Sequence, residues 1–440
     1  MKLLKNIVLT SALILPTTLL ANANNNQDLQ QLADNYLSSH AISEGITEVS
    51  LGVSTGSGNF QSYYAGRTSK DTFAPSPTDN NLTEVGSITK SFTGVLILQL
   101  EAQGKLNIND PISKYLSNLP APWQKATIKE LLNMTSGIPD YQEPSAFGDA
   151  YIPNYNPGPH WTPEQLIDIT WKYQQKNCPS NNCVNEGIFP PGSNWSYSNT
   201  NYLLAGMIIR KITGQSLESE LQHQVFARDK LNLSNTFYLP YSFSNLPVVY
   251  RYANIPNRVI HGYDFGDSYM PTGADVTNVD ESEAGPGGAI TSNLQDMTQW
   301  FEAIFNQNST LQLKAQQYQE LETAVCESTS YNCTPGQPVS MSPTVTDGYS
   351  LGLTTAYFPK LGIIWDYEGE TFGYRFFWVL VQNPKLPIPY LLITTATNSD
   401  PSDDAVSIAY LAIQAAEKLE GIPTSNAQGS SIRSFTKSSQ

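Results

Sequence analysis

The pattern of hydrophobic and polar positions along the chain predicts strands near both ends and helices in between. Residues 46–54 and 60–66 have the composition of two strands, and the Gly/Ser-rich segment that joins them predicts a hairpin. Near the other end, residues 362–367, 374–382 and 388–398 are predicted to form three consecutive strands. We therefore expect a mixed α/β (α+β) fold, in which an antiparallel sheet is assembled from both termini and a helical subdomain is inserted between its strands.

One predicted helix is apolar on almost every side, from Val95 to Leu100. A helix without a polar face is buried inside a domain rather than laid on its surface. A second strongly apolar helix is predicted over residues 203–212, and Thr162 with Gln165 three positions later has the spacing of a capping box. Further helices are predicted within residues 24–44, 126–133, 294–305 and 403–419.

The first 23 residues have the pattern of a secretory signal peptide. Lys2 and Lys5 precede an apolar run over residues 7–20, and an Ala-x-Ala site ends at Ala23. The run is shorter than the roughly 18 apolar residues that a membrane-spanning helix needs. We therefore expect cleavage after Ala23 and a protein that is periplasmic or secreted, without a stable membrane anchor.

Charge and composition narrow the classes of partner. The formal net charge is −15, and a chain this acidic is a poor candidate for binding nucleic acid or an anionic membrane surface. With 40% hydrophobic residues, the chain can bury a large core. We expect one domain over residues 24–422, followed by a disordered Ser-rich tail over residues 423–440.

The four cysteines form two close pairs, Cys178 with Cys183 and Cys326 with Cys333. In an oxidising compartment such pairs are expected to form local disulfides that close short loops. A four-cysteine zinc site is the alternative, but the spacing within each pair differs from that of a zinc ribbon. We therefore expect two disulfides and neither a metal nor a cofactor.

A serine and a lysine stand at the start of the buried helix in the order Ser-x-x-Lys. Ser87 lies at the predicted first turn, and Lys90 rises from the same helical face, with about 5–6 Å between the two Cβ atoms. The pair offers a nucleophile beside a cation that can lower the pKa of a neighbouring group. The spacing by itself also fits an N-capping serine with a solvated lysine, so other motifs must decide between these interpretations.

A second nucleophile motif, Gly-x-Ser-x-Gly, occurs at residues 52–56. In α/β-hydrolases a helix follows the serine of this motif directly, because the strained turn between strand and helix exposes the serine. Here a Gly/Ser-rich turn and another predicted strand follow Ser54. We therefore do not expect Ser54 to be a nucleophile.

Three more segments carry recognisable motifs. Residues 131–137 read Leu-Leu-Asn-Met-Thr-Ser-Gly, residues 197–199 read Tyr-Ser-Asn, and a Gly-Gly pair at 287–288 precedes a predicted helix. Together with the Ser-x-x-Lys motif, they resemble the serine β-lactamase and penicillin-binding family over roughly residues 45–420. The resemblance is greatest to class C β-lactamases, D-Ala-D-Ala carboxypeptidases, D-aminopeptidases and related esterases, although Met134 stands where histidine is usual. It implies a DD-peptidase/β-lactamase-like fold.

The resemblance also implies roles for individual residues. Ser87 would be the nucleophile, and a serine hydroxyl needs an adjacent base. Tyr197 or Lys90 would take the serine proton, since the Lys90 ammonium favours the Tyr197 phenolate, and one of them would return the proton to the leaving group. Asn199 would donate to a substrate carbonyl and help to fix Lys90. The backbone N–H groups of Ser87 and Glu370 would form the oxyanion hole.

The third motif of the family departs from its usual pattern. The family has Lys-Thr-Gly or His-x-Gly there, followed by three residues and Gly-Tyr. This chain instead reads Tyr-Glu-Gly-Glu-Thr-Phe-Gly-Tyr over residues 367–374. Gly369 keeps the frame, whereas Tyr367 replaces the basic residue and Glu368 replaces the small one. By resemblance, Tyr367, Gly369 and Glu370 would line the substrate site.

These replacements bear on the charge of the substrate. Tyr367 can donate one hydrogen bond but brings no charge to hold a terminal carboxylate. Glu368 would repel an anionic substrate if it faced the cleft, and Arg375 could compensate if it faced the site. The departure leaves acyl transfer intact as an expectation and weakens the case for a substrate that ends in a carboxylate.

Our leading hypothesis is an exported serine hydrolase that forms an acyl-serine intermediate at Ser87, most similar to a D-Ala-D-Ala carboxypeptidase or peptidase. The nearest alternative is an esterase or a D-aminopeptidase of the same fold, followed by a β-lactamase, which must also hold a carboxylate. A non-catalytic ligand-binding relative is the remaining alternative, and the intact set of Ser87, Lys90 and Tyr197 argues against it. The expected partner is a small-molecule or peptide substrate: a cell-wall peptide, an ester or a β-lactam.

Overall fold

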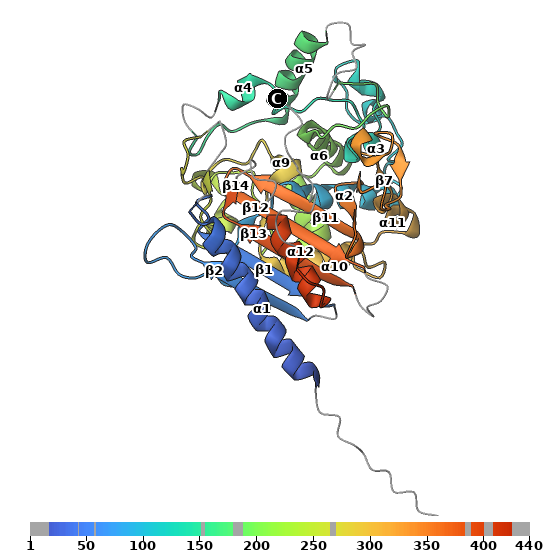
Figure 1. The fold of residues 1–440 in the computed structure, drawn as a ribbon. Coiled ribbons are helices and arrows are strands. Elements are labelled where there is room, and N and C mark those ends of the chain that lie inside the picture. Colours follow the sequence, from blue (N-terminus) through green and yellow to red (C-terminus); the bar gives the residue numbers. More distant parts are fainter. Residues whose placement is uncertain are drawn as a thin grey trace, which may run out of the picture.

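A nine-stranded antiparallel sheet forms the centre of the computed structural model (Figure 1). The structure describes residues 17–42, 44–56, 59–150, 155–178, 188–264, 270–382, 389–399 and 408–424. In the order in which they pair, its strands are β2 (Phe60–Gly66), β1 (Glu48–Ser54), β13 (Tyr390–Ala396), β12 (Tyr374–Val381), β11 (Gly362–Thr371), β10 (Thr354–Phe358), β9 (Asp347–Tyr349), β7 (Ala324–Val325) and β8 (Pro338–Val339). Two smaller sheets contain β3 (Thr83–Glu84), β6 (Ile290–Ser292) and β4 (Phe237–Tyr238), and β14 (Asn398–Ser399) with β5 (Tyr263–Asp264).

The assembly of this sheet from both ends of the chain is confirmed. The predicted N-terminal hairpin is β1 with β2, and β1 pairs on its other edge with β13, where Val49 lies opposite Ala396. Of the three predicted C-terminal strands, β11 is longer than expected because it continues to Thr371. The Tyr-Glu-Gly-Glu segment therefore lies within a strand. Ser54 ends β1 in the hairpin, as expected for a serine that is not on a strand-to-helix turn.

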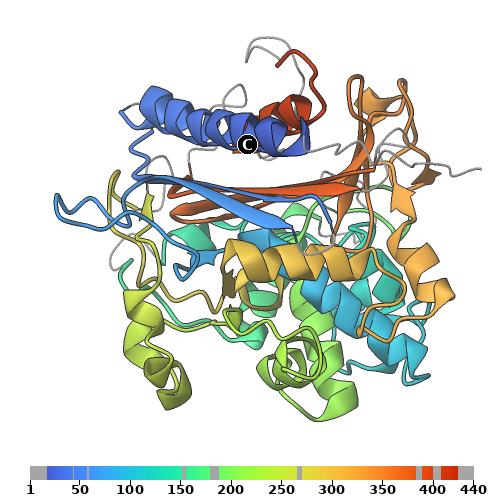
Figure 2. The same ribbon diagram turned by 90° about the horizontal axis from the view of Figure 1, so that it is seen from below.

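Helices cover both faces of the large sheet (Figure 2). On one face lie α1 (Thr17–His40) and α12 (Ile408–Leu419), and on the other lie α2 (Thr89–Ala102) and α10 (Leu294–Ile304). All eight residues of β12 are buried because this strand has a helical layer on each side. The remaining α-helices are α3 (Ile128–Leu132), α4 (Ser145–Gly148), α5 (Pro163–Asn177), α6 (Asn199–Thr213), α7 (Leu217–Leu221), α8 (Val248–Tyr252), α9 (Gly285–Gly288) and α11 (Ala315–Leu321).

The helix predicted to be buried is α2, and all of its 14 residues are buried. Its start differs from the prediction. Ser87 lies in a 3-10 turn, Gly86–Ile88, that precedes the first α-helical turn. The capping box predicted for α5 is confirmed: the Thr162 side chain accepts from the Gln165 N–H, and the Gln165 side chain accepts from the Thr162 N–H.

Several predictions concern segments at or beyond the limits of the described residues. Residues 1–16 lie outside them, so the signal peptide stays a prediction, as does a tail over residues 423–440, of which only the first two residues are described. Among the described helices, none has the length and hydropathy needed to cross a membrane. The Cys326–Cys333 disulfide is confirmed. Cys178 is disulfide-bonded, while Cys183 lies outside the described residues.

The turn that carries Ser87 depends on Gly86. Its φ is +52°, a left-handed value that residues other than glycine adopt only at a cost in free energy. A Cβ atom at this position would also lie 2.5 Å from the Glu370 nitrogen and 2.6 Å from its carbonyl oxygen. The glycine therefore allows the turn before α2 to approach the end of β11 directly.

We predict that Gly86→Ala lowers the free energy of unfolding more than Gly104→Ala does. Gly104 follows α2 with a φ of +72°, and a Cβ atom there would meet nothing within 4 Å. Gly104→Ala should therefore cost only the conformational strain, about 1–2 kcal/mol, whereas Gly86→Ala adds a clash with the β11 backbone. Urea unfolding of both variants measures the difference, and equal losses would contradict the close contact between the turn and β11.

Candidate active site

Lys90 is fully buried at the start of α2, and three acceptors surround its ammonium group. Its Nζ atom donates to Ser87 Oγ at 2.9 Å, to Asn199 Oδ1 at 2.8 Å and to the Gly287 carbonyl at 3.0 Å. A protonated lysine has three N–H donors, so all three are used. This complete set compensates for removing the charge from water.

Tyr197 is the second side chain that hydrogen-bonds to Ser87, after Lys90. The Tyr197 hydroxyl lies 2.6 Å from Ser87 Oγ, and Lys90 Nζ lies 4.9 Å from the centre of the Tyr197 ring. Burial raises the pKa of Tyr197 above its ordinary value, although the Lys90 cation acts in the opposite direction. The expected effect of Lys90 is therefore present, but burial outweighs it, and the free site holds a protonated phenol at neutral pH.

The segment with Met134 in place of histidine holds the loop that carries Tyr197. The Met134 sulfur accepts from the Ser198 N–H and from Asn201 Nδ2, both at 3.4 Å, and the Met134 carbonyl accepts from the Ser196 N–H at 3.0 Å. A thioether is a weak acceptor without a proton to donate. Met134 thus helps to position the loop that carries Tyr197.

Asn199 lies at the first position of α6 and bridges Lys90 to the loop after residue 137. Its Oδ1 accepts from Lys90, while Nδ2 donates to Asp140 Oδ2 at 2.9 Å and to Gln142 Oε1 at 3.2 Å. The expected help in fixing Lys90 is visible. Both amide donors, however, are engaged with protein acceptors, so donation to a substrate carbonyl requires that one of these bonds be exchanged.

Tyr367 reaches Tyr197 from β11. Its hydroxyl donates to Tyr197 Oη at 3.3 Å and lies 3.1 Å from the hydroxyl of Tyr349 on β9. No pattern in the sequence predicted β9, which has only three residues, and Tyr349 was therefore not expected at the site. Gly369, two residues along β11, packs against the Val85 carbonyl, where a Cβ atom would lie 1.9 Å away.

The structure resolves two conditional expectations about charge in the cleft. Alternate residues of β11 face opposite sides of the sheet, and Tyr367 faces the core that contains α2. Glu368 instead forms an ion pair with Arg375, at 3.3 Å between Oε1 and Nη2. Arg375 lies opposite Ala396, which packs in the core beneath α1 and α12. Glu368 and Arg375 therefore lie on the face of the sheet away from α2, so Glu368 does not repel a substrate bound at Ser87 and Arg375 does not compensate there.

Glu370 has an exposed side chain at the end of β11. Its backbone approaches the Gly86 turn, next to Ser87, as described above. This neighbourhood is compatible with an oxyanion hole formed by the backbone N–H groups of Ser87 and Glu370, which stays a prediction. The substrate-binding role of Gly369 likewise stays a prediction.

Four carboxyl groups, here called the acidic cluster, gather near these residues: Glu84, Asp140, Glu281 and Glu283. Glu84 accepts from Thr371 Oγ1 at 2.7 Å, and Asp140 accepts from Asn199. Burial raises the pKa of Glu283 to about 8, with the Lys90 cation acting against it. Burial, then repulsion from Glu84 and Glu283, raises the pKa of Glu281 well above its ordinary value. The acidic cluster therefore has four carboxyl groups beside the single cation of Lys90, and a bound cation would favour the ionised form of these groups.

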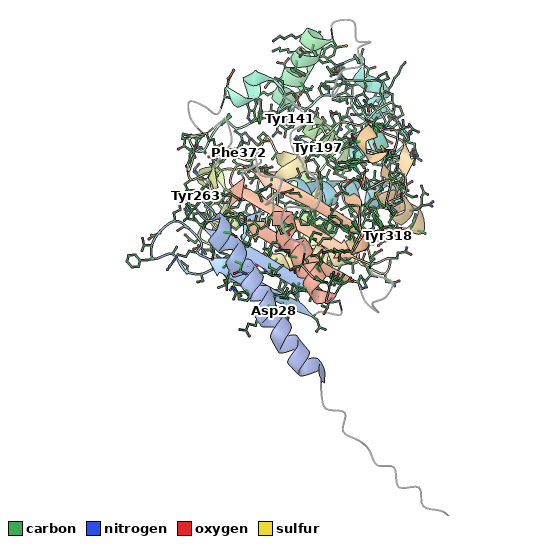
Figure 3. All side chains as sticks on the ribbon, in the orientation of Figure 1. Asp28, Tyr141, Tyr197, Tyr263, Tyr318 and Phe372 are labelled. Carbon is green, nitrogen blue, oxygen red and sulfur yellow. A yellow bond between two sulfur atoms is a disulfide. The ribbon has the colours of Figure 1, made fainter. Side chains whose placement is uncertain are left out.

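In Figure 3, Tyr197 and Tyr141 are labelled where the large sheet meets the helical region. The Tyr141 hydroxyl donates to the Glu283 carbonyl at 2.7 Å and lies 3.1 Å from Glu283 Oε2. Asp140, Tyr141 and Gln142 were not predicted as site residues. Their only signal in the sequence is their place in a turn-rich segment after the Thr-Ser-Gly motif.

Comparisons with known proteins agree with this arrangement. The family model named Beta-lactamase matches residues 27–417. Penicillin-binding protein 4* of Bacillus subtilis is 30% identical over 161 residues, which are 36% of this chain and 31% of that protein. This chain thus matches less than a third of that relative's length.

Two solved structures share the fold. The D-stereospecific amidohydrolase from Streptomyces sp. superposes with a TM-score of 0.64 at 24% identity, covering 84% of this chain and 94% of the other. The D-amino acid amidase from Ochrobactrum anthropi SV3, in complex with D-phenylalanine, gives 0.68 at 20% identity, covering 90% and 99%. With the family match over most of the chain, the protein belongs to the Beta-lactamase family of serine hydrolases and has the DD-peptidase/β-lactamase fold.

Proposed function

We propose that this protein hydrolyses amides, peptides or esters of D-amino acids that have a free amino group, through an acyl-enzyme at Ser87. One observation carries the choice of substrate: Tyr367, a neutral hydroxyl, occupies the position where the family has a basic residue. The acidic cluster supports it, because carboxylates favour an ammonium group and disfavour a terminal carboxylate. Of the two solved neighbours described above, one is named a D-stereospecific amidohydrolase and the other a D-amino acid amidase.

The reaction begins when Ser87 Oγ attacks the carbonyl carbon of the substrate. The serine proton passes to the Lys90–Tyr197 pair, the carbon–nitrogen or carbon–oxygen bond breaks, and the pair returns the proton to the leaving group. Water then cleaves the Ser87 ester and releases the acid. Because burial raises the pKa of Tyr197 and keeps the phenol protonated in the free site, this proton must leave before Tyr197 can act as the base. The acylation rate should therefore rise with pH.

The carboxypeptidase hypothesis remains the second candidate, supported by the similarity to penicillin-binding protein 4*. A substrate of that kind ends in a carboxylate, which needs a cation in the cleft. Lys90 is committed to three protein acceptors, and Arg375 lies on the other face of the sheet. These contacts favour the amidase or aminopeptidase alternative.

We further propose that the protein is exported, with cleavage after Ala23, on the basis of the N-terminal pattern. Expression of the full chain in a bacterium should then yield a protein that begins at Asn24 in the periplasmic or medium fraction. N-terminal sequencing measures this directly. A protein that retains Met1, or is confined to the cytoplasm, would contradict export.

Covalent labelling tests the nucleophile. Wild-type protein incubated with p-nitrophenyl acetate should gain one acetyl group, and Ser87→Ala should gain none because the attacking oxygen is absent. Ser54→Ala is the matched control, since this serine belongs to the competing motif and should still allow labelling. Intact-protein mass spectrometry reads all three. Loss of the adduct in Ser54→Ala with retention in Ser87→Ala would show that Ser54, and not Ser87, is the nucleophile.

Substrate pairs test the preference for an amino group. D-alanine p-nitroanilide should be cleaved with a kcat/KM at least about tenfold above that of its N-acetyl derivative, since tenfold corresponds to about 1.4 kcal/mol of interaction. Glu281→Gln should narrow this ratio, because glutamine keeps the size of the side chain and cannot ionise when an ammonium group binds. If an N-acylated peptide ending in D-Ala-D-Ala is the better substrate, the carboxypeptidase hypothesis replaces ours.

A further inference from the structure

Three tyrosine hydroxyls form a continuous chain that ends on the nucleophile. Tyr349 lies 3.1 Å from Tyr367, Tyr367 donates to Tyr197 at 3.3 Å, and Tyr197 lies 2.6 Å from Ser87 Oγ. The three come from β9, from β11 and from the loop before α6. They are brought together only by the tertiary fold, and the catalytic roles proposed above use only Tyr197.

The donors of the site determine where the protons in this chain point. Lys90 already donates to Ser87 Oγ, so the serine's own O–H can be directed to Tyr197 Oη. Tyr367 donates to the same Tyr197 oxygen. Two donors thus converge on one phenolic oxygen. A phenolate accepts both of them, whereas a neutral phenol must also find an acceptor for its own proton.

The chain is held rigidly. Tyr349 and Tyr367 are each 1% exposed, and their rings meet edge to face at 80° with centroids 5.7 Å apart. Tyr349 also meets the Tyr197 ring at 81° and packs against Trp195, with a centroid distance of 5.8 Å. Moving the Tyr367 hydroxyl away from Tyr197 would require repacking this aromatic group. Leaving a buried hydroxyl without a hydrogen-bond partner also costs free energy.

From this geometry we propose that Tyr367 is a positioning residue that stabilises the Tyr197 phenolate during acylation, with Tyr349 orienting it from behind. The inference rests on the proposed acyl-enzyme at Ser87. A hydrogen bond to an ionised acceptor is stronger than one between neutral groups, so the contact strengthens as the Tyr197 proton leaves. A neutral donor does this without adding a second cation that would attract a carboxylate.

Besides Tyr197, the titratable groups in and around this chain come from five segments. They are Lys90 from α2, Tyr202 from α6, Tyr349 from β9, Tyr367 from β11 and Glu327 from the segment after β7. Lys90 favours the Tyr197 phenolate, whereas a negative charge on Tyr367 would disfavour it, so Tyr367 can assist only as a neutral donor. Glu327 acts on Tyr367 and disfavours its ionisation. Tyr367 itself is a donor rather than an anion, because burial raises its pKa.

The pH dependence of acylation tests the proposal. For the wild-type protein, kcat/KM with p-nitrophenyl acetate should rise with pH as Tyr197 loses its proton. Tyr367→Phe keeps the ring and removes the donor. The midpoint of this rise should move up by about one to two pH units, and the rate at neutral pH should fall about tenfold to hundredfold. Tyr349→Phe should move the midpoint in the same direction by less.

Tyr374→Phe is the matched control. Tyr374 is also 1% exposed, lies on the neighbouring strand β12, and donates its hydroxyl to the Ile260 carbonyl at 2.7 Å, outside the chain that ends on Ser87. Its replacement should cost stability without moving the midpoint. Circular dichroism checks that each variant folds, and Tyr349→Phe carries the test if Tyr367→Phe does not.

The outcomes separate the two proposals. An unchanged midpoint in the folded Tyr367→Phe and Tyr349→Phe variants, or a shift to lower pH, would overturn the role of Tyr367 and leave the acyl-enzyme standing. Failure of the wild-type protein to label Ser87 would overturn the proposed function itself. An equal shift in Tyr374→Phe would show that the effect is a general consequence of removing a buried hydroxyl.

Discussion

The arrangement of this site depends on one buried cation. The ammonium of Lys90 is removed from water and compensated by three acceptors: Ser87 before α2, Asn199 at the start of α6, and Gly287 in α9. Removing one partner of a buried charge lowers the stability by several kcal/mol, because the charge cannot recover its hydration. The packing of three helices and the placement of the nucleophile are therefore one constraint. Any displacement of α6 or α9 would disturb Lys90 and, through it, Ser87.

The features that sequence could predict are those set by short spacing. An all-apolar run predicts the buried helix α2, a capping box predicts the start of α5, and a Gly/Ser-rich segment between two strand-like runs predicts the β1–β2 hairpin. The Ser-x-x-Lys and Tyr-Ser-Asn motifs likewise depend on local geometry at helix starts. Each motif presents its side chains on one short element, so the order of motifs was enough to bring Ser87, Lys90 and Tyr197 together as an expectation.

The features that sequence could not predict are set by contacts between distant segments. Whether Glu368 and Arg375 face the cleft depends on the register of β11 with β12 and on which helices cover each face. The balance between burial and the Lys90 charge at Tyr197 depends on how completely neighbouring rings exclude water. Tyr349 enters the site from a three-residue strand whose position is fixed only by its neighbours in the sheet.

The pairing of β1 with β13 also governs how this protein can fold. Next to these strands, the Thr47 N–H donates to Thr397 Oγ1 across 350 positions of the chain. Contacts between such distant residues require a large loop to close first, which slows folding. Until the last strands arrive, one edge of β1 offers unpaired backbone groups that can pair with another molecule. In an incompletely folded chain, this open edge of β1 is therefore a site through which aggregation can begin.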